Sequence, residues 1–348
     1  MEKRRSFDGL TGLKGIFIFI IVWFHTLPKT PLMDRIPLTS FIGTYGGTLG
    51  NYMFFMLSGF LISWGYRERI ARGEISFRDF LMRRLRKLYP LYLLSNLVML
   101  AGELVQHGIS VINLKRIVLT LLLQNGGGLE TVHPYNGPSW FVSALLVCYM
   151  AYYFAAYRAK NQTQYGCLIA FGIIWGYSIA IGGWTPPLSF ARCGEGFLNF
   201  FLGCALAEVY PRIPKKKWLQ YGALLVLGAS GFLLMRYGVE VIAGDSKVAF
   251  AFVICPLLLY VACGENLLSR FLGCRPMVYL GRISVSVYFW HYVICDIFDY
   301  AHWVLFGEAV GDAAYGVYLI VLVLCSVLSY HFLENGRGMK RLAERCFC

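Results

Sequence analysis

Apolar runs recur along the whole chain. The first extends from Leu13 to Phe24, and the others occupy about residues 45–65, 88–106, 138–157, 165–183, 195–210, 218–236, 248–263, 279–300 and 315–333. A membrane-spanning helix needs about 20 predominantly apolar residues. Because 57% of the 348 residues are hydrophobic and only 15% are charged, a water-soluble fold is excluded. We therefore predict an all-α fold, a polytopic transmembrane helical bundle of about ten spans in which residues 1–348 form a single domain.

The distribution of basic residues predicts how this bundle lies in the membrane. Lys and Arg accumulate in the cytoplasmic loops of membrane proteins. With the N-terminus inside, the loops on the same side hold the basic residues Arg67, Arg69, Arg72, Arg78, Arg83, Arg84, Arg86, Lys87, Arg158, Lys160, Lys215, Lys216, Lys217, Arg270 and Arg275. We therefore expect both termini in the cytoplasm, with residues 334–348 as a short basic tail. The net charge of +13 is explained in this way without a nucleic-acid partner.

Two shorter features refine the prediction. Three basic residues at positions 3–5 precede the first apolar run, and no small-residue cleavage site follows it, so we expect a retained signal anchor. The apolar stretch 117–123 is too short to cross a bilayer, and counting it as a span would place the basic loop at 215–217 outside. We expect a half-inserted or interfacial helix that packs on protein.

Lys14 and His25 are the first candidates for chemistry, because ionisable residues inside spans are costly. They are eleven residues apart, almost three helical turns, so they share one face at a separation of about 16 Å along the axis. A structural histidine and an interfacial anchor lysine are the plain alternatives. The spacing suits a long ligand with an anionic head near Lys14 and a reactive end near His25.

Two further groups of residues carry polar chemistry at the ends of spans. The run that opens the span at 88–106 contains four cations within five positions, which bind either lipid head groups or the phosphates of a ligand. A second group could contact a sugar ring, or form an ordinary aromatic belt and buried polar contacts. The first group is Arg83, Arg84, Arg86 and Lys87; the second is Tyr135, Asn136, Ser139, Trp140 and His291.

We predict no metal site, because most of the eleven cysteines lie inside apolar runs without C-x-x-C spacing.

Short motifs lie in a fixed order along the chain, in segments 12–16 with 22–25, which contain the basic residue and the histidine, then 54–62, 80–90, 139–149, 281–291 and 329–334. This order resembles one known family, the acyltransferase 3 family of integral-membrane enzymes. These enzymes O-acylate sugars and other surface molecules in bacteria. The family usually has arginine where this chain has Lys14, and glutamate is common where it has Leu145.

The resemblance implies an O-acyltransferase in the bacterial cytoplasmic (inner) membrane. Such an enzyme transfers an acyl group, expected to be acetyl, from cytoplasmic acyl-CoA to a hydroxyl of a cell-surface or lipid-linked glycan. Acetyl-CoA is then a co-substrate, and no tightly bound cofactor is expected. The catalytic residues are His25, as general base, and Lys14; direct transfer and an acyl-histidine intermediate both remain open. Lys14, Arg83, Arg84 and Arg86 are expected to bind the donor, and Tyr135, Asn136, Ser139, Trp140 and His291 the acceptor.

A transporter is the alternative, since intramembrane charges also line transport paths. Against it stand the lack of paired broken helices in two repeated halves and the concentration of basic residues at one helix start.

Overall fold

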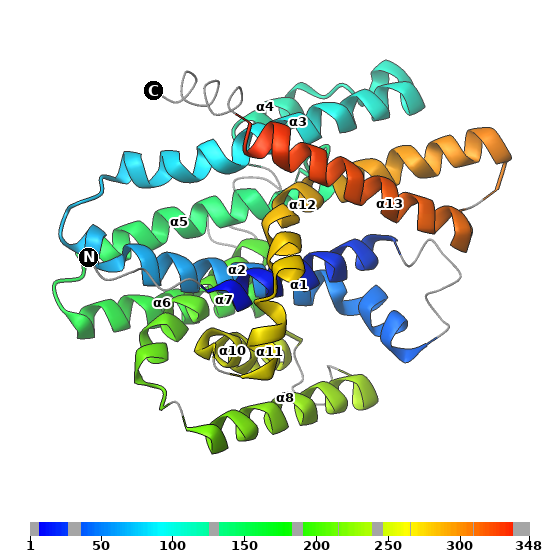
Figure 1. Ribbon diagram of the computed structural model, residues 1–348. Coiled ribbons are helices and arrows are strands. Elements are labelled where there is room, and N and C mark those ends of the chain that lie inside the picture. Colours follow the sequence, from blue (N-terminus) through cyan, green and yellow to red (C-terminus); the bar gives the residue numbers. More distant parts are fainter. Residues whose placement is uncertain are drawn as a thin grey trace.

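The computed structural model describes residues 7–26, 36–124, 132–182, 191–214, 216–238, 246–264, 266–308 and 310–336. Every regular element in these ranges is a helix, which confirms the all-α fold (Figure 1). The elements are α1 (Asp8–Thr26), α2 (Pro37–Ala71), α3 (Phe77–His107), η2 (Gly108–Val111), α4 (Leu114–Leu121), η3 (Gly137–Ser139), α5 (Trp140–Arg158), α6 (Gln162–Ile181), α7 (Ala191–Val209), η4 (Tyr210–Arg212), α8 (Lys217–Tyr237), α10 (Ser246–Cys263), α11 (Leu267–Leu272), α12 (Arg275–Phe306), α13 (Asp312–Ser329) and the π-turn η5 (Tyr330–Glu334).

Each of the ten predicted apolar segments falls on one of these helices. Six helical stretches are long and apolar enough to cross a membrane: Asp8–Thr26, Phe77–Val111, Gly137–Arg158, Gln162–Ile181, Trp218–Tyr237 and Asp312–Glu334. The protein is therefore a multi-pass membrane protein. The other four helices are α2, α7, α10 and α12, so the count of ten spans stays a prediction.

The short stretch near residue 117 forms the eight-residue helix α4. At 1.5 Å per residue such a helix is about 12 Å long, too short to cross a bilayer. It packs on α3, where the hydroxyl of Tyr89 donates to the carbonyl of Leu121 and the hydroxyl of Tyr92 donates to that of Thr120, both at 2.9 Å. The predicted basic tail lies outside the described residues from position 337 onward.

Helix α1 lies at the centre of the bundle, between α2 and α12 (Figure 1). Close approach to α12 depends on Gly281, because a Cβ there would lie 1.7 Å from the carbonyl oxygen of Thr11. A similar contact joins α2 to α7, where a Cβ on Gly59 would lie 1.9 Å from the carbonyl oxygen of Phe200. Small residues allow helix backbones to pack this tightly inside a membrane.

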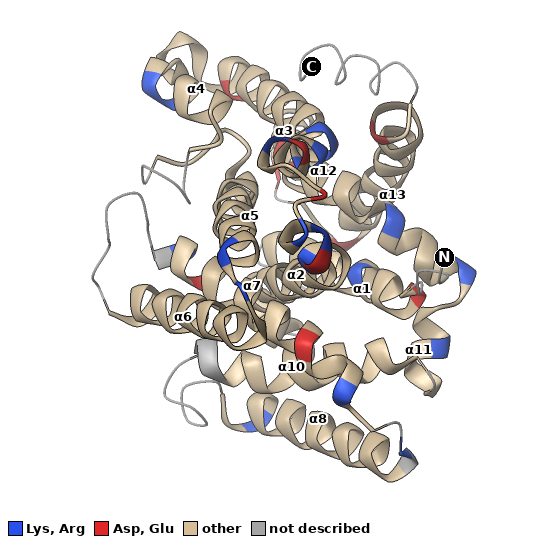
Figure 2. Cartoon of the chain, turned by 90° about the vertical axis from the view of Figure 1, so that its left-hand side faces the viewer, with Lys and Arg blue, Asp and Glu red and all other residues tan. Residues whose placement is uncertain are grey.

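Contacts between the helix ends define two opposite ends of the bundle. At one end, the ring of Phe7 before α1 packs on Trp64 of α2 and on Tyr210 after α7, both at 5.8 Å. Arg69 and Arg72 lie at this end, in the last turn and at the C-terminal cap of α2. Figure 2 looks onto this end of the bundle, with Lys and Arg in blue. At the other end, the hydroxyls of Thr26 and Tyr315 are 2.8 Å apart. His25 therefore lies at the end opposite Phe7.

Candidate active site

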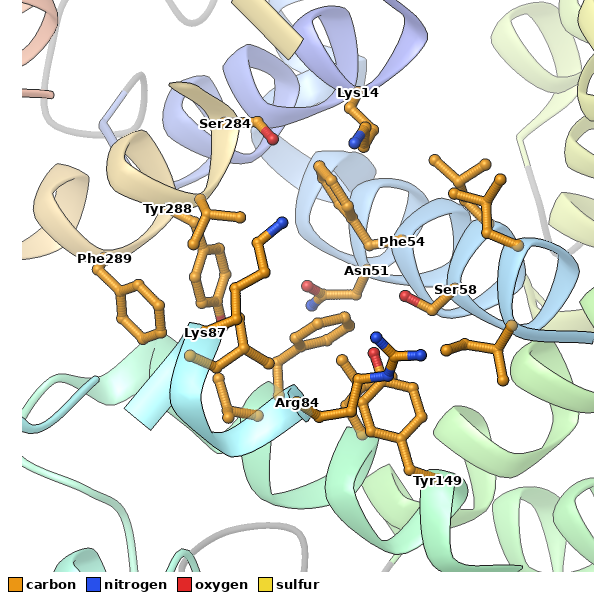
Figure 3. Close-up of a pocket in the computed structure, with 18 residues that line it drawn as sticks. Lys14, Asn51, Phe54, Ser58, Arg84, Lys87, Tyr149, Ser284, Tyr288 and Phe289 are labelled. Atoms are coloured by element: carbon orange, nitrogen blue, oxygen red, sulfur yellow. The ribbon is translucent and has the colours of Figure 1, made fainter. Parts of the chain in front are cut away.

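A cavity of about 260 Å³ lies between α1, α2, α3, α5 and α12. Figure 3 shows the side chains that point into it. Most of the wall is apolar, which is typical of pockets that bind organic ligands. The polar lining residues are Lys14, Asn51, Ser58, Arg84, Lys87, Tyr149, Ser284 and Tyr288.

Three cations from two helices face this cavity: Lys14 of α1, and Arg84 and Lys87 of α3. No carboxylate lines the cavity among the described residues. Glu334 lies close enough to interact electrostatically with both lysines, and its carboxylate accepts a hydrogen bond from Ser286 at 3.3 Å. The excess of positive charge suits an anionic ligand.

Arg84 packs on aromatic rings at the edge of the cavity. Its guanidinium lies over the rings of Tyr66, at 4.5 Å, and Phe80, at 5.2 Å. The Nε and Nη2 atoms are buried and have no hydrogen-bond partner among the described residues. Buried donors of this kind require a partner, and a bound anion would supply one.

The other two arginines of the predicted donor site do not line the cavity. Arg83 is exposed, because the helix turns it away from the side that Arg84 occupies. Arg86 lines a separate small pocket together with Lys87 and Glu334. The structure thus brings Lys14 and Arg84 together and adds Lys87, while a donor-binding role for Arg83 and Arg86 stays a prediction.

The cavity extends along α1 from Lys14 toward the end that holds His25. Helix α2 runs antiparallel to α1, so that Gly50 packs on Ile21. Asn51 therefore lines the cavity at about the depth of Ile21, and Ser58 lines it two turns away in the direction of Lys14.

His25 itself does not line the cavity and is joined to it by a series of rings. Tyr288 forms part of the cavity wall, and its ring centroid is 5.9 Å from that of His291. The His291 ring is in turn 5.2 Å from the His25 ring, with the planes at 44°. Tyr292 also contacts His25, at 5.5 Å. Lys14 and His25 thus both face the interior of the protein, at different levels of α1.

Two residues of the predicted acceptor site, Asn136 and Ser139, join three helices. The Asn136 side-chain amide donates to the Ser95 hydroxyl at 3.1 Å and to the Phe289 carbonyl at 2.9 Å. The Asn96 amide donates to the Ser139 hydroxyl at 3.2 Å. Both side chains are buried, so these contacts give them a structural role. Binding of an acceptor by them stays a prediction.

The two aromatic residues of the predicted acceptor site, Tyr135 and Trp140, each have the guanidinium of an arginine over the ring. The Tyr135 ring is 3.9 Å from the guanidinium of Arg116, and the Trp140 ring is 5.1 Å from that of Arg192. Arg116 also forms a two-point ion pair with Glu103, at 2.9 and 3.1 Å. Tyr135 and Trp140 are both buried, so any contact with an acceptor stays a prediction.

Sequence reasoning missed several residues of the cavity wall. Asn51, Tyr149 and Ser284 lie inside apolar runs and carry no charge that would single them out. A usable signal existed for Lys87, which belongs to the basic cluster, and for Tyr288, which lies three residues before His291. Among the described residues, no group of three or more His, Cys, Asp and Glu side chains is arranged to hold a metal ion.

The fold and the cavity define a multi-pass helical membrane protein with a cationic pocket buried between its helices. The chain belongs to the acyltransferase family: the family model described as an acyltransferase domain matches residues 7–331. This confirms the family resemblance found in the motifs, and it favours an enzyme over a transporter.

Two curated relatives align along almost the entire chain. The O-acetyltransferase OatA of Staphylococcus aureus is 25% identical over 378 residues, which cover 99% of this chain and 59% of the relative. The putative peptidoglycan O-acetyltransferase YrhL of Bacillus subtilis is 23% identical over 397 residues, which cover 99% of this chain and 57% of the relative. The chain therefore spans less than two thirds of the length of these relatives. No solved structure matches it.

Proposed function

We propose that this protein is an O-acetyltransferase that transfers an acetyl group from cytoplasmic acetyl-CoA to a hydroxyl of an envelope glycan. The observation that carries the proposal is the cavity with three inward-facing cations at one level of α1 and a histidine pair further along the same helix. Family membership supports acyl transfer. The name of the Bacillus subtilis relative, a putative peptidoglycan O-acetyltransferase, suggests an acceptor of the peptidoglycan type.

In this proposal the cationic cavity binds the donor. Lys14, Arg84 and Lys87 hold the phosphates of acetyl-CoA. All three cations line the cavity, and phosphate oxygens would supply the partners that the buried Nε and Nη2 atoms of Arg84 lack among the described residues. The polar groups of Ser58 and Asn51 line the way along which the thioester arm extends toward His25. Binding of phosphates by the three cations leaves the apolar wall to contact the arm.

His25 then acts as general base in direct transfer. It takes the proton of the acceptor hydroxyl as the hydroxyl oxygen attacks the thioester carbonyl carbon. The carbon–sulfur bond breaks, the ester forms, and the departing CoA thiolate receives the proton back from His25. A hydroxyl is a weak nucleophile at neutral pH, and a neutral imidazole is suited to accept its proton.

The proposed direction of transfer follows from the two ends of the bundle. Basic residues such as Arg67, Arg72 and Arg158 lie at the end that also holds Phe7, as expected for a cytoplasmic side. His25 lies toward the opposite end, so the acceptor is expected to reach it from outside. The membrane is then the cytoplasmic one, with acetyl-CoA inside and the glycan outside.

The decisive experiment replaces His25 by alanine in the full chain. Expressed in cells that lack the gene, His25→Ala should lower base-releasable acetate on isolated peptidoglycan by about 100-fold or more, the contribution typical of a general base. The matched control is His107→Ala at the exposed end of α3, which should leave acetylation unchanged. Full acetylation by His25→Ala at normal protein level would refute the proposal.

A second assay tests the donor. The purified full chain in detergent should release free CoA thiol from acetyl-CoA when soluble peptidoglycan fragments are added. If the protein neither binds nor consumes labelled acetyl-CoA, then acetyl-CoA is excluded as the donor.

A further inference from the structure

His291 lies next to His25 and has one nitrogen whose state the structure defines. The side chain is completely buried in α12. Its Nδ1 is 2.6 Å from the carbonyl oxygen of Tyr288. A carbonyl oxygen can only accept a hydrogen bond, so Nδ1 must carry the proton.

The other nitrogen of this imidazole is therefore an acceptor. In a neutral ring with a proton on Nδ1, Nε2 holds a free lone pair. Nε2 of His291 is buried and has no hydrogen-bond partner among the described residues. A buried acceptor without a partner is unfavourable, so we expect a donor to approach this nitrogen during function.

His25 is the group best placed to provide that donor. The two ring centroids are 5.2 Å apart. An N–H···N hydrogen bond of about 3 Å between two imidazoles brings their ring centroids to about 5 Å, so a small rotation makes this bond. The hydroxyl of Tyr288 already donates to the carbonyl of Pro138, and that of Tyr318 donates to the carbonyl of His291. His25 is partly exposed, whereas the side chain of His291 is completely buried.

We propose that His291 is the positioning residue for His25, an inference that rests on the proposed role of His25 as general base. Nε2 of His291 accepts a hydrogen bond from one ring nitrogen of His25. The second nitrogen of His25 is thereby left unprotonated and directed to the acceptor hydroxyl. When His25 takes the hydroxyl proton, the same bond holds the imidazolium until the proton passes to the CoA thiolate. A base oriented by a third group is a recurring arrangement in acyl transfer.

Two substitutions of His291 separate this role from a purely structural one. The amide of His291→Asn lies near the position of Nδ1, so it keeps a donor for the Tyr288 carbonyl but provides no acceptor at Nε2. The longer His291→Gln places its amide oxygen near Nε2. We expect His291→Asn to lower kcat for CoA release at least tenfold and His291→Gln to keep at least a third of it. The KM for acetyl-CoA should be unchanged in both, because His291 does not line the donor cavity.

The double variant with His25→Ala tests the coupling. If His291 acts through His25, adding His291→Asn to His25→Ala lowers the residual activity no further. All assays use the purified full chain with acetyl-CoA and soluble peptidoglycan fragments, and thermal unfolding in detergent verifies that each variant is folded.

Three outcomes would overturn the inference: wild-type kcat in His291→Asn, an equal large loss in folded His291→Gln, or a rise in the KM for acetyl-CoA. If His291→Asn does not fold, the kcat of His291→Gln decides alone, and a tenfold loss in that folded variant refutes the role. The result for His25→Ala distinguishes the two proposals. Full activity of that variant defeats the proposed function, whereas its inactivity beside an active His291→Asn defeats only the positioning role.

Discussion

Two adjacent arginines of α3 allow a sharp test of the donor site. Arg84 faces the cavity with two buried donor atoms that lack a hydrogen-bond partner among the described residues, whereas Arg83 is exposed to the surroundings. Substitution by glutamine removes the same charge from the same turn of helix in both cases. The donor site proposed here predicts that only Arg84→Gln strongly weakens the binding of acetyl-CoA.

The size of the effect follows from the environment of each side chain. A hydrogen bond to a charged group contributes about 1.5–3 kcal/mol, so Arg84→Gln should raise the Kd for acetyl-CoA by about 10- to 150-fold. An exposed ion pair contributes about 0–1 kcal/mol, so Arg83→Gln should raise it by less than about fivefold. Adding salt should further reduce the change in Kd caused by Arg83→Gln. It should alter the change caused by Arg84→Gln less, because buried charges are screened less.

The assay is equilibrium binding of labelled acetyl-CoA to the purified full chain in detergent. Thermal unfolding of each variant serves as the control, since Arg84 also lies over the rings of Tyr66 and Phe80. Equal weakening by both substitutions in folded protein, or a larger effect of Arg83→Gln, would show that the cavity is not the phosphate site.

Two further predictions concern the charge on α1 and the packing of α2. Lys14→Arg should keep most of kcat/KM for acetyl-CoA, because the charge remains, whereas Lys14→Gln should lower it about tenfold or more; equal losses would argue against a phosphate contact. Gly59→Ala should destabilise the protein by about 1–3 kcal/mol, because the new Cβ would lie 1.9 Å from the Phe200 carbonyl oxygen. Gly102→Ala meets no atom within 4 Å and should raise the unfolding temperature slightly, so shifts of the same sign would contradict the packing.

The helical fold was predictable because few backbone structures satisfy their hydrogen bonds inside a lipid bilayer. In a bilayer the backbone groups of a single chain segment must bond within that segment, so long apolar runs become helices. Each of the ten apolar runs accordingly lies on a helix. Helices α2 and α7 were also predicted as spans, but they are not among the helices apolar enough to cross a membrane by composition, and their glycine residues pack against other helices.

The candidate site was predictable where an ionisable residue interrupts an apolar run or where cations cluster at the start of a helix. Lys14, His25 and His291 were all identified in this way, and the structure turns each of them toward the interior. Arg83 and Arg84 could not be separated from the sequence, because adjacent residues on a helix point in different directions and the position of the neighbouring helices decides which one is inside.

The sequence by itself determined a helical membrane protein, its family, and the placement of a lysine and a histidine on one face of a single helix. These features follow from local chemistry, namely apolar run length, helical periodicity and the order of short motifs. Only the tertiary structure decided which cations share a cavity, and that Asn136 and Ser139 join helices. It also decided that His291 of α12 meets His25 of α1, because contacts between residues distant in sequence depend on how the helices pack.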